Sequence, residues 1–160
     1  MSKKFWLMKS EPDTYSIDKL ESDGVTWWEG VRNYQARNYM VKEMEVGDEI
    51  LFYHSSCEIP GVAGLAVVSK KAEADKTQFD KKSDYFDPKA TKEKPNWFCV
   101  QVKFKSHFKK LIALEKIRET HQLKDMIVIT KGSRLSIQPV TEADFHYLVK
   151  MGSAPDSFVK

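Results

Sequence analysis

The sequence has little of what disulfide-stabilised, secreted or membrane proteins depend on. It contains only two cysteines, Cys57 and Cys99, without paired metal-ligand spacing, and Cys99 lies in an apolar run. Buried free thiols in a reducing compartment are therefore expected instead of a disulfide. Only four apolar residues separate Lys4 from Lys9, too few for a signal peptide or a membrane span. These absences predict a cytoplasmic protein with no membrane partner.

Strong charge and the common cofactor motifs are also missing. The 26 Lys and Arg residues against 23 Asp and Glu give a net charge of +3 and a pI near 8.7, which is well short of a polycation. No H-x-x-x-H or C-x-x-C frame and no phosphate-cradling glycine loop is present. We therefore expect neither a metal nor a cofactor. The histidines are far apart in the chain: His54, His107, His121 and His146.

The length of 160 residues fits one domain that buries about two-thirds of its unfolded surface. We expect this domain over residues 1–152, with a short tail at 153–160, and a monomer. The stretch from Lys70 to Pro95 is rich in charge and poor in aliphatics, which predicts a long loop. Such a loop is usually a lid or a mobile excursion, and Phe79, Tyr85 and Phe86 favour some docking onto the body.

Short apolar runs bounded by Gly or Pro predict about five strands. The clearest is "NWFCVQVKF", where Phe98, Val100 and Val102 alternate with more polar neighbours, so that one face lies in the core. The other predicted strands are Lys4 to Lys9, Asp48 to His54, Gly61 to Lys70 and Arg134 to Val140.

Helices are predicted between these strands. Ser16 can cap "IDKLES", and Asn33 can cap "YQARNYMVKEM" before Gly47. Thr141 can cap a last helix that stops at Gly152, and a short helix fits "ALEKIRET". Strands and helices without regular βαβ alternation indicate an α+β domain on a small, mostly antiparallel sheet that curls toward a barrel.

The stretch "KSEP" ends the first predicted strand with a cation, a hydroxyl and a carboxylate: Lys9, Ser10 and Glu11. A strand end of this kind can line a pocket. An ordinary strand exit, with Glu11 paired to a nearby lysine, is the alternative.

The stretch "WWEGVRNYQARN" places two tryptophans beside arginines, asparagines and a glycine. Gly30 allows a sharp turn or a close approach to a ligand, and Val31, Arg32 and Asn33 then lie at a helix N-terminus. Aromatic rings beside amide and guanidinium donors suit an unstacked nucleic-acid base. The alternative places one tryptophan in the core and leaves Arg32 and Arg37 in water.

Three further segments each allow a functional and a structural interpretation. "FYHSS" suggests His54 as a base with Ser55 or Cys57, but adjacent residues on an extended chain point to opposite faces, which makes the His54–Ser55 couple geometrically poor. "KFKSHFKK" would project Lys103 and Lys105 to one side as a phosphate-facing stripe, or as an ordinary solvated strand edge. "KGSRLSIQPV" would aim Arg134 and Ser136 along one face of a strand, with a structural salt bridge at Arg134 as the alternative.

Six segments together resemble the EVE-domain family of the PUA-like superfamily, which is akin to the thymocyte nuclear protein family and more distantly to YTH-type readers of methylated adenine. They span almost the whole chain in the expected order: "WLMKSEPDTYSIDKL", "WWEGVRNYQARN", "GDEILFYHSS", "PGVAGLAVV", "DPKATKEKPNWFCVQVKF" and "GSRLSIQPVTEADF".

This resemblance implies a PUA-like fold, a curved five- to six-stranded sheet or pseudo-barrel with surrounding helices. Its cleft would receive a flipped-out modified base of DNA or RNA, with no bond made or broken. Trp28 and a second apolar surface would sandwich the base, while Ser10, Asn33 and Ser55 read its edge. A methyl or hydroxymethyl group adds roughly 1 kcal/mol, so pocket shape would decide selectivity.

The pocket residues carried over from the resemblance are Lys9, Ser10, Glu11, Trp28, Val31, Arg32, Asn33, Tyr34, His54, Ser55, Arg134, Leu135 and Ser136. The expected contacts to backbone phosphate are Arg32, Arg37, Lys103, Lys105 and Arg134.

The chain departs from the eukaryotic pattern because Phe5 opens the first strand without a preceding lysine-rich tail, which favours a stand-alone, prokaryote-like form. Trp27 and Trp28 should face opposite ways in an extended segment, and only the family pattern favours Trp28 as the stacking residue. Three other functions stay open. These are an RNA- or nucleotide-processing enzyme that uses Lys9, Glu11 and His54, a sensor of free nucleosides, and a purely structural interaction module.

Overall fold

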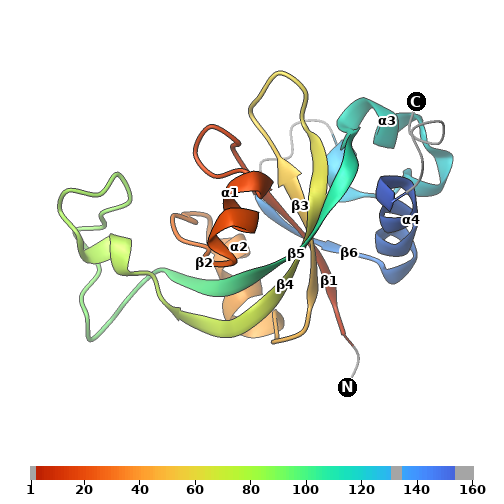
Figure 1. The fold of residues 1–160 in the computed structure, drawn as a ribbon. Coiled ribbons are helices and arrows are strands. Elements are labelled where there is room, and N and C mark those ends of the chain that lie inside the picture. The colour runs from red at the N-terminus through yellow and green to blue at the C-terminus, as the bar shows by residue number, and fades with distance from the viewer. Residues whose placement is uncertain (1–2, 131–134, 154–160) are drawn as a thin grey trace.

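The computed structural model describes residues 3–130 and 135–153 and holds a curved, six-stranded sheet with helices on both faces (Figure 1). The sheet order is β2-β5-β4-β3-β1-β6. Its strands are β1 (Phe5–Ser10), β2 (Val25–Trp27), β3 (Glu49–His54), β4 (Gly61–Ala74), β5 (Phe98–Ala113) and β6 (Ile137–Val140). The α-helices are α1 (Ile17–Asp23), α2 (Tyr34–Asn38), α3 (Leu114–Glu119) and α4 (Glu142–Ser153). Residues 154–160 of the predicted tail lie outside the described residues.

The curvature of the sheet comes from its two longest strands, β4 and β5. They pair antiparallel from Gly61↔Ala113 to Ala74↔Phe98, and the register shifts at four places along the way. Each shift bends a strand and increases its twist. The sheet therefore wraps around the helices on its concave side instead of lying flat, as the long β4 and β5 ribbons show (Figure 1).

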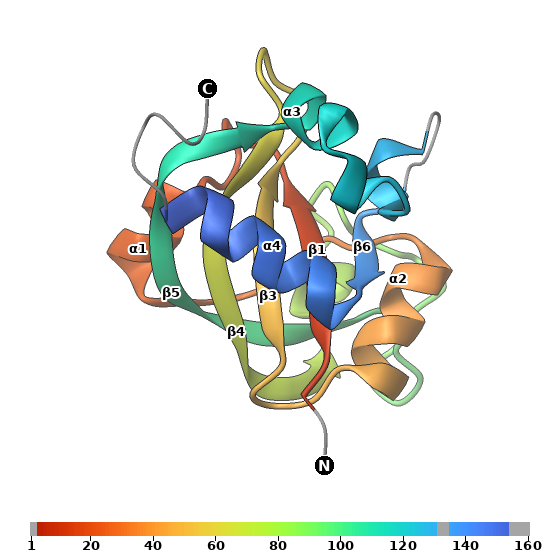
Figure 2. The same ribbon diagram turned by 90° about the vertical axis from the view of Figure 1, so that its right-hand side faces the viewer.

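Both faces of the sheet are buried, as the side chains of β1 show, because successive residues point alternately into two hydrophobic clusters. Trp6 and Met8 point into one hydrophobic cluster, together with residues of α1 and α2. Phe5 and Leu7 point into the other, against α3 and α4. In Figure 2, α4 crosses the second face over β3 and β4, on the side away from α1 and α2. A strand buried on both sides explains why "FWLM" is apolar without interruption.

The predicted helix caps are present. The Ser16 side chain accepts a hydrogen bond from the Lys19 N–H, and the Asn33 side chain accepts one from the Ala36 N–H. The Thr141 hydroxyl accepts one from the Asp144 N–H at 3.2 Å. The helix after Asn33 is not a single α-helix, because α2 is followed by the π-helix η1 (Tyr39–Glu43), which ends before Gly47.

The structure extends the predicted sheet in three ways. The three-residue strand β2 adds a sixth strand, and it is too short for a periodic pattern to indicate. The segment "KFKSHFKK" continues β5 as far as Ala113. The pair β1–β3 is parallel, whereas the other four pairs are antiparallel. The predicted α+β class with a curved, mostly antiparallel sheet is confirmed.

The predicted long loop is an ordered excursion between β4 and β5, here called the 75–97 segment and comprising residues 75 to 97. It contains the 3₁₀ helix η2 (Lys76–Phe79) and is closed at its base by the buried Gln78. The Gln78 amide donates to the carbonyls of Asp75 and Trp97, and its oxygen accepts from the Asn96 and Trp97 N–H groups. This one side chain joins the two ends of the segment.

Both cysteines are free, with Cys99 buried and Cys57 half-buried. Burial raises the pKa of the Cys99 thiol to about 12. Within the described residues, no helix is both long enough and apolar enough to cross a membrane.

Candidate functional site

A cavity with a volume of about 530 Å³ opens beside the end of β1. Four separate parts of the chain form it. These are the strand end with the loop after it, the Thr26–Arg32 stretch, the 75–97 segment and the residue before β6. Its lining residues are Lys9, Ser10, Glu11, Thr14, Tyr15, Thr26, Trp27, Trp28, Glu29, Gly30, Val31, Arg32, Tyr85 and Ser136.

The end of β1 supplies one wall of mixed polarity. Lys9 is half-buried, its ammonium lies 5.9 Å from the centre of the Tyr53 ring, and burial lowers its pKa. The Ser10 hydroxyl donates to the Tyr15 carbonyl at 2.6 Å, which leaves its oxygen lone pairs available as acceptors. The Glu11 side chain is exposed, while its carbonyl accepts the Thr14 and Tyr15 N–H groups and so shapes the loop.

The two tryptophans supply the aromatic wall. Trp27 is half-buried at the end of β2, opposite Gln101 of β5. Trp28 follows, and its N–H donates to the Val100 carbonyl at 2.9 Å. The residue is only 8% exposed, and its ring meets Phe52 edge-on at 5.4 Å between ring centres, so most of the indole belongs to the core although Trp28 also lines the cavity. Both tryptophans therefore contribute to the cavity wall.

Charged side chains of both signs line the cavity: Lys9, Arg32, Glu11 and Glu29. Glu29 is exposed in the cavity, and its pKa is raised by partial burial and by the nearby Asp75 carboxylate. Lys9 also lines the cavity, and its ammonium has no carboxylate partner among the described side chains. The cavity thus offers hydrogen-bond acceptors on Glu11 and Glu29 and a donor on Lys9, next to flat indole surfaces.

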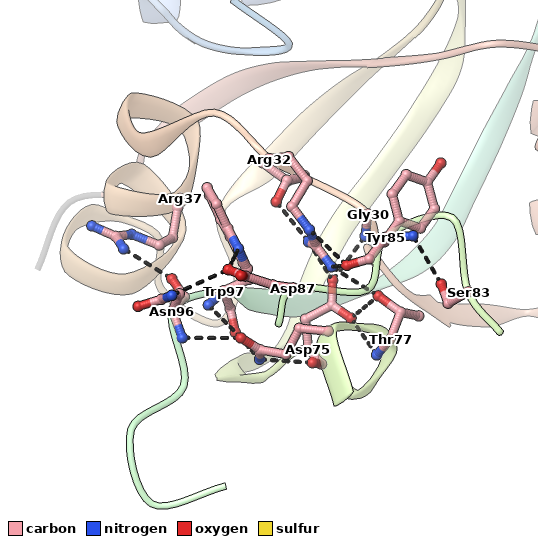
Figure 3. A network of polar contacts seen from close by, with 12 residues as sticks. Gly30, Arg32, Arg37, Asp75, Thr77, Ser83, Tyr85, Asp87, Asn96 and Trp97 are labelled. Atoms are coloured by element: carbon pink, nitrogen blue, oxygen red, sulfur yellow. Dashed lines mark hydrogen bonds and ion pairs between the residues drawn. The ribbon is translucent and has the colours of Figure 1, made fainter. Parts of the chain in front are cut away.

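The turn at Gly30 is fixed by a buried aspartate of the 75–97 segment (Figure 3). Gly30 has φ of +87°, in the left-handed region that glycine tolerates. Its N–H donates to the Asp75 carboxylate at 2.8 Å, and Arg32 pairs with the same carboxylate at 3.2 Å. Burial alone would raise the pKa of Asp75, but hydrogen bonds from Thr77, Gly30 and Arg32 outweigh burial and lower it. Asp75 is therefore a charged anchor inside the protein.

Arg32 and Arg37 have protein partners for most of their donors. Arg32 donates to the Tyr85 carbonyl at 2.7 Å and to the Thr77 hydroxyl at 3.0 Å. Arg37 donates to the Asn96 carbonyl at 2.8 Å. Both arginines therefore donate hydrogen bonds to the 75–97 segment and help to hold it against the rest of the domain. A contact of either arginine with phosphate stays a prediction.

The two predicted lysines of β5 differ in their surroundings. Lys105 forms an ion pair with Glu49, whose other carboxylate oxygen pairs with Lys3 at 3.3 Å. Lys103 is exposed and has no ion-pair partner among the described side chains. A contact of either lysine with phosphate stays a prediction.

Asn33 and Tyr34, which the resemblance placed in the pocket, lie outside the lining of the cavity. The Asn33 side chain is the cap of α2, with its oxygen accepting the Ala36 N–H at 2.9 Å. The Tyr34 ring is 60% exposed and stacks on Trp97 at 4.8 Å between ring centres. Val31, in contrast, is buried in the cavity wall.

His54 and Ser55 also lie outside the lining of this cavity. The His54 ring borders a second, more open cavity of about 430 Å³, together with Cys57. Its Nε2 accepts the Ile17 N–H at 3.1 Å, at the start of α1, and burial lowers its pKa. The N–H of Ser55 donates to the Ser10 carbonyl. His54 is therefore a neutral acceptor that holds α1, and its Nε2 lone pair is not free for base catalysis.

The predicted segment before β6 is placed only in part. Ser136 lines the cavity, and its carbonyl accepts the Lys9 N–H at 2.8 Å. Leu135 is half-buried and packs against the core cluster of α1 and α2. Arg134 lies outside the described residues.

Several lining residues were not among the predicted pocket residues, among them Tyr15, Glu29 and Tyr85, although Tyr85 was expected to favour docking of the loop onto the body. Tyr15 and Glu29 lie within or close to the recognised motifs. Extending the predicted pocket to the neighbours of each motif would have included them. Tyr85 lies more than fifty positions after the tryptophan stretch in the sequence. Only its aromatic ring, in an otherwise charged loop, indicated that it docks onto the body.

One cluster could hold a metal ion, away from the main cavity. Asp18, Glu21 and His107 bring one ligand atom each to within 4.8 Å of one another, and all three are exposed. His107 Nε2 lies 2.8 Å from Asp18, so the histidine already has a carboxylate partner. Sequence spacing could not indicate this group because α1 and β5 are far apart in the chain.

Comparisons with known proteins agree with this architecture. Residues 4–151 match the EVE domain family. Human thymocyte nuclear protein 1 is 39% identical over 165 aligned positions, which cover 91% of this chain and 72% of that protein. The zebrafish protein of the same name, from Danio rerio, is 40% identical over 91% of this chain and 71% of its own length.

Solved structures extend the likeness to the whole fold. A protein from Leishmania major superposes with a TM-score of 0.90 at 46% identity, covering 94% of this chain and 95% of that one. Human THYN1 protein in complex with 5-methylcytosine containing DNA superposes with a TM-score of 0.88 at 37% identity, covering 96% and 99%. The curved mixed sheet with its helices is thus the EVE, PUA-like fold, and the chain belongs to the EVE domain family.

Proposed function

We propose that this protein binds DNA that carries a methylated base, 5-methylcytosine above all, by holding the flipped base in the 530 Å³ cavity without chemical change. The observation that carries the proposal is the cavity lining, which combines two tryptophans with two cations, Lys9 and Arg32, and two carboxylates, Glu11 and Glu29. The structural likeness to human THYN1 in complex with 5-methylcytosine containing DNA supports the choice of the base.

The polar groups of the cavity suit the edge of cytosine. Cytosine presents an amino group that donates hydrogen bonds, next to a ring nitrogen and a carbonyl oxygen that accept them. Glu11 or Glu29 can accept from the amino group, and the Lys9 ammonium can donate to the carbonyl oxygen. A uracil or thymine, which lacks the amino group, would leave a carboxylate facing a carbonyl oxygen.

The 5-methyl group has to be read by shape. Burying one methyl group contributes about 0.8 kcal/mol, close to a fourfold preference. A stronger preference for 5-methylcytosine needs the indole edges and Val31 to enclose the methyl group closely, since a gap of even a fraction of an ångström forfeits much of the dispersion energy.

The enzyme alternative receives less support from the geometry. Lys9 and Glu11 line the main cavity, whereas His54 borders the second one and uses its Nε2 as an acceptor for α1. The three groups do not face one site.

A sensor of free nucleosides and a reader of modified RNA remain alternatives that the same experiment separates. We also propose a cytoplasmic monomer, to be checked by imaging of the tagged protein and by light scattering.

The test is fluorescence anisotropy with labelled single-stranded and duplex oligonucleotides of DNA and RNA. Each carries cytosine, 5-methylcytosine or 5-hydroxymethylcytosine at one position. Glu11→Gln and Glu29→Gln change exposed cavity carboxylates and should weaken binding to 5-methylcytosine DNA several-fold. Glu58→Gln, an exposed carboxylate of the second cavity, is the matched control and should not.

Trp28→Ala is a poor probe here, because truncating a buried tryptophan costs about 3–5 kcal/mol of stability. Equal affinity for modified and unmodified DNA would refute the proposal. Equal affinity for the free nucleoside and the oligonucleotide, with little salt dependence, would favour the nucleoside sensor. Tighter binding to modified RNA than to modified DNA would make the protein a reader of RNA.

A further inference from the structure

We propose that Tyr85 is the second aromatic wall of the cavity and stacks on the bound base opposite the tryptophans. This inference rests on the proposed function and adds a binding residue supplied by the 75–97 segment. It also assigns that segment a purpose, since the segment carries the ring to the cavity from the far end of the β4–β5 ribbon.

The Tyr85 ring lies directly against the backbone of Gly30 (Figure 3). A Cβ atom at Gly30 would come within 2.7 Å of two carbons of the Tyr85 ring. The glycine therefore gives the ring room to lie at the cavity wall, next to the tryptophan segment. The side chain is 42% exposed, which is a large fraction for an aromatic ring held at one place.

The ring is held without use of its exposed surface. The Tyr85 carbonyl accepts two hydrogen bonds from Arg32, at 2.7 Å and 3.2 Å, and the guanidinium lies 5.4 Å from the ring centre. Arg32 is in turn paired with Asp75, whose side chain is fully buried. A binding surface that is fixed before the ligand arrives avoids part of the entropy cost of binding.

The ring has no partner across the cavity. Among the described residues, Tyr85 makes a cation–π contact with Arg32 but no ring contact with Trp27 or Trp28, and its hydroxyl has no hydrogen-bond partner. Tyr34 offers the contrast. It is also exposed and lies beside an arginine, but its ring already stacks on Trp97. Among the described residues, the Tyr85 ring therefore stacks on no other ring, although it lines the same cavity as Trp27 and Trp28.

The test compares three variants with wild type for binding to 5-methylcytosine DNA. Tyr85→Leu keeps the backbone hydrogen bonds to Arg32 but removes the ring, and should weaken binding roughly tenfold or more, as expected for loss of one stacking partner. Tyr85→Phe keeps the ring and should remain within about threefold of wild type. Tyr147→Leu, on α4 at the opposite face, is the matched control and should bind as wild type does.

The outcomes separate this inference from the proposed function. Wild type without preference for 5-methylcytosine DNA would refute the proposed function itself. A wild type with that preference, and a Tyr85→Leu variant that binds equally well, would refute only the role of Tyr85. Equal losses in Tyr85→Leu and Tyr85→Phe would assign the contact to the hydroxyl and overturn stacking. Thermal melts of each variant show whether a loss reflects the fold. A folded Tyr85→Leu variant with weaker binding, together with a Tyr85→Phe variant of wild-type affinity, supports stacking.

Discussion

At the scale of single residues, His54 shows how a histidine can serve the fold by staying neutral. Its Nε2 accepts the Ile17 N–H, so protonation would place two N–H groups face to face at the start of α1. Burial lowers its pKa from 6.5, against an opposing effect of Asp18. A group whose pKa is lower in the folded state binds fewer protons there than in the unfolded chain. The stability that neutral His54 contributes is therefore complete above pH 6.5 and is lost as the pH falls below that value.

We expect His54→Gln to flatten this part of the pH profile, because glutamine offers an acceptor that does not titrate. Urea unfolding at pH 5, 6, 7 and 8 measures the effect. The pKa of His107 is raised, first by its bond to the Phe108 carbonyl, so this histidine stabilises the fold at low pH. His107→Gln should therefore make the free energy of unfolding fall more steeply at acidic pH. The two variants are thus expected to change the pH dependence of stability in opposite directions. Parallel profiles for His54→Gln and wild type would show that His54 does not titrate as described.

Gly30 gives a second prediction at this scale. Gly30→Ala adds backbone strain at φ of +87° and a clash with the Tyr85 ring, and should cost about 1–3 kcal/mol of stability. Gly24→Ala is the matched control, since Gly24 has φ of +82° but no atom within 4 Å of an added Cβ. The difference between the two unfolding free energies isolates the contact with Tyr85. Equal costs would mean that the ring moves aside freely.

At the scale of elements, the anchoring of the 75–97 segment depends on one buried carboxylate. Asp75→Asn replaces an oxygen that accepts from Gly30 and Arg32 by a donor, and turning the amide only moves the conflict to Thr77. Breaking a buried pair costs about 3–5 kcal/mol, and we expect about 2–3 here because Arg32 is 23% exposed.

The segment should then open locally before the domain unfolds. Trypsin should cleave Asp75→Asn faster than wild type at the lysines between residues 76 and 94. Asp80→Asn is the control and should be cut at the wild-type rate, because Asp80 is exposed and its carboxylate accepts only the Lys82 N–H among the described residues. Unchanged cleavage of Asp75→Asn would show that the other contacts of the segment, those of Gln78 and Arg37 among them, hold it without Asp75.

The same elements mark how far the sequence could predict the structure. Short apolar runs, the alternation in "NWFCVQVKF" and three helix caps contributed to the prediction of five of the described strands and the four described α-helices, since these patterns depend on neighbours within a few residues. The parallel pairing of β1 with β3 and the strand β2 depend on contacts between distant parts of the chain, which local patterns do not contain.

The site divides in the same way. The tryptophan stretch and "KSEP" were recognised by composition and do line one cavity. The ion pair of Arg32 with Asp75 and the packing of the Tyr85 ring on Gly30 could not be predicted, because each contact joins residues more than forty positions apart in the sequence. Asn33 shows the opposite limit, since one side chain fits both a helix cap and a base contact, and the structure uses it as the cap.

At the scale of the whole molecule, one sheet separates two hydrophobic clusters and belongs to both. Because successive residues of β1 alternate between the clusters, neither cluster can lose its packing while the sheet stays intact. The two faces should therefore unfold together. Leu20 on α1 and Leu148 on α4 are both fully buried, one on each face, and provide a matched pair of leucines.

We expect Leu20→Ala and Leu148→Ala each to cost about 2–5 kcal/mol and to lower the midpoint of a single thermal transition by roughly 5–15 °C. Calorimetry checks this directly, because one cooperative unit requires that the calorimetric and van't Hoff enthalpies agree in wild type and in both variants. A second transition in Leu148→Ala alone would mean that α4 and its cluster melt separately from the face that carries the cavity. Binding of methylated DNA could then stabilise only half of the molecule. A single transition instead means that a ligand in the cavity stabilises the α4 face to the same extent as the face it touches.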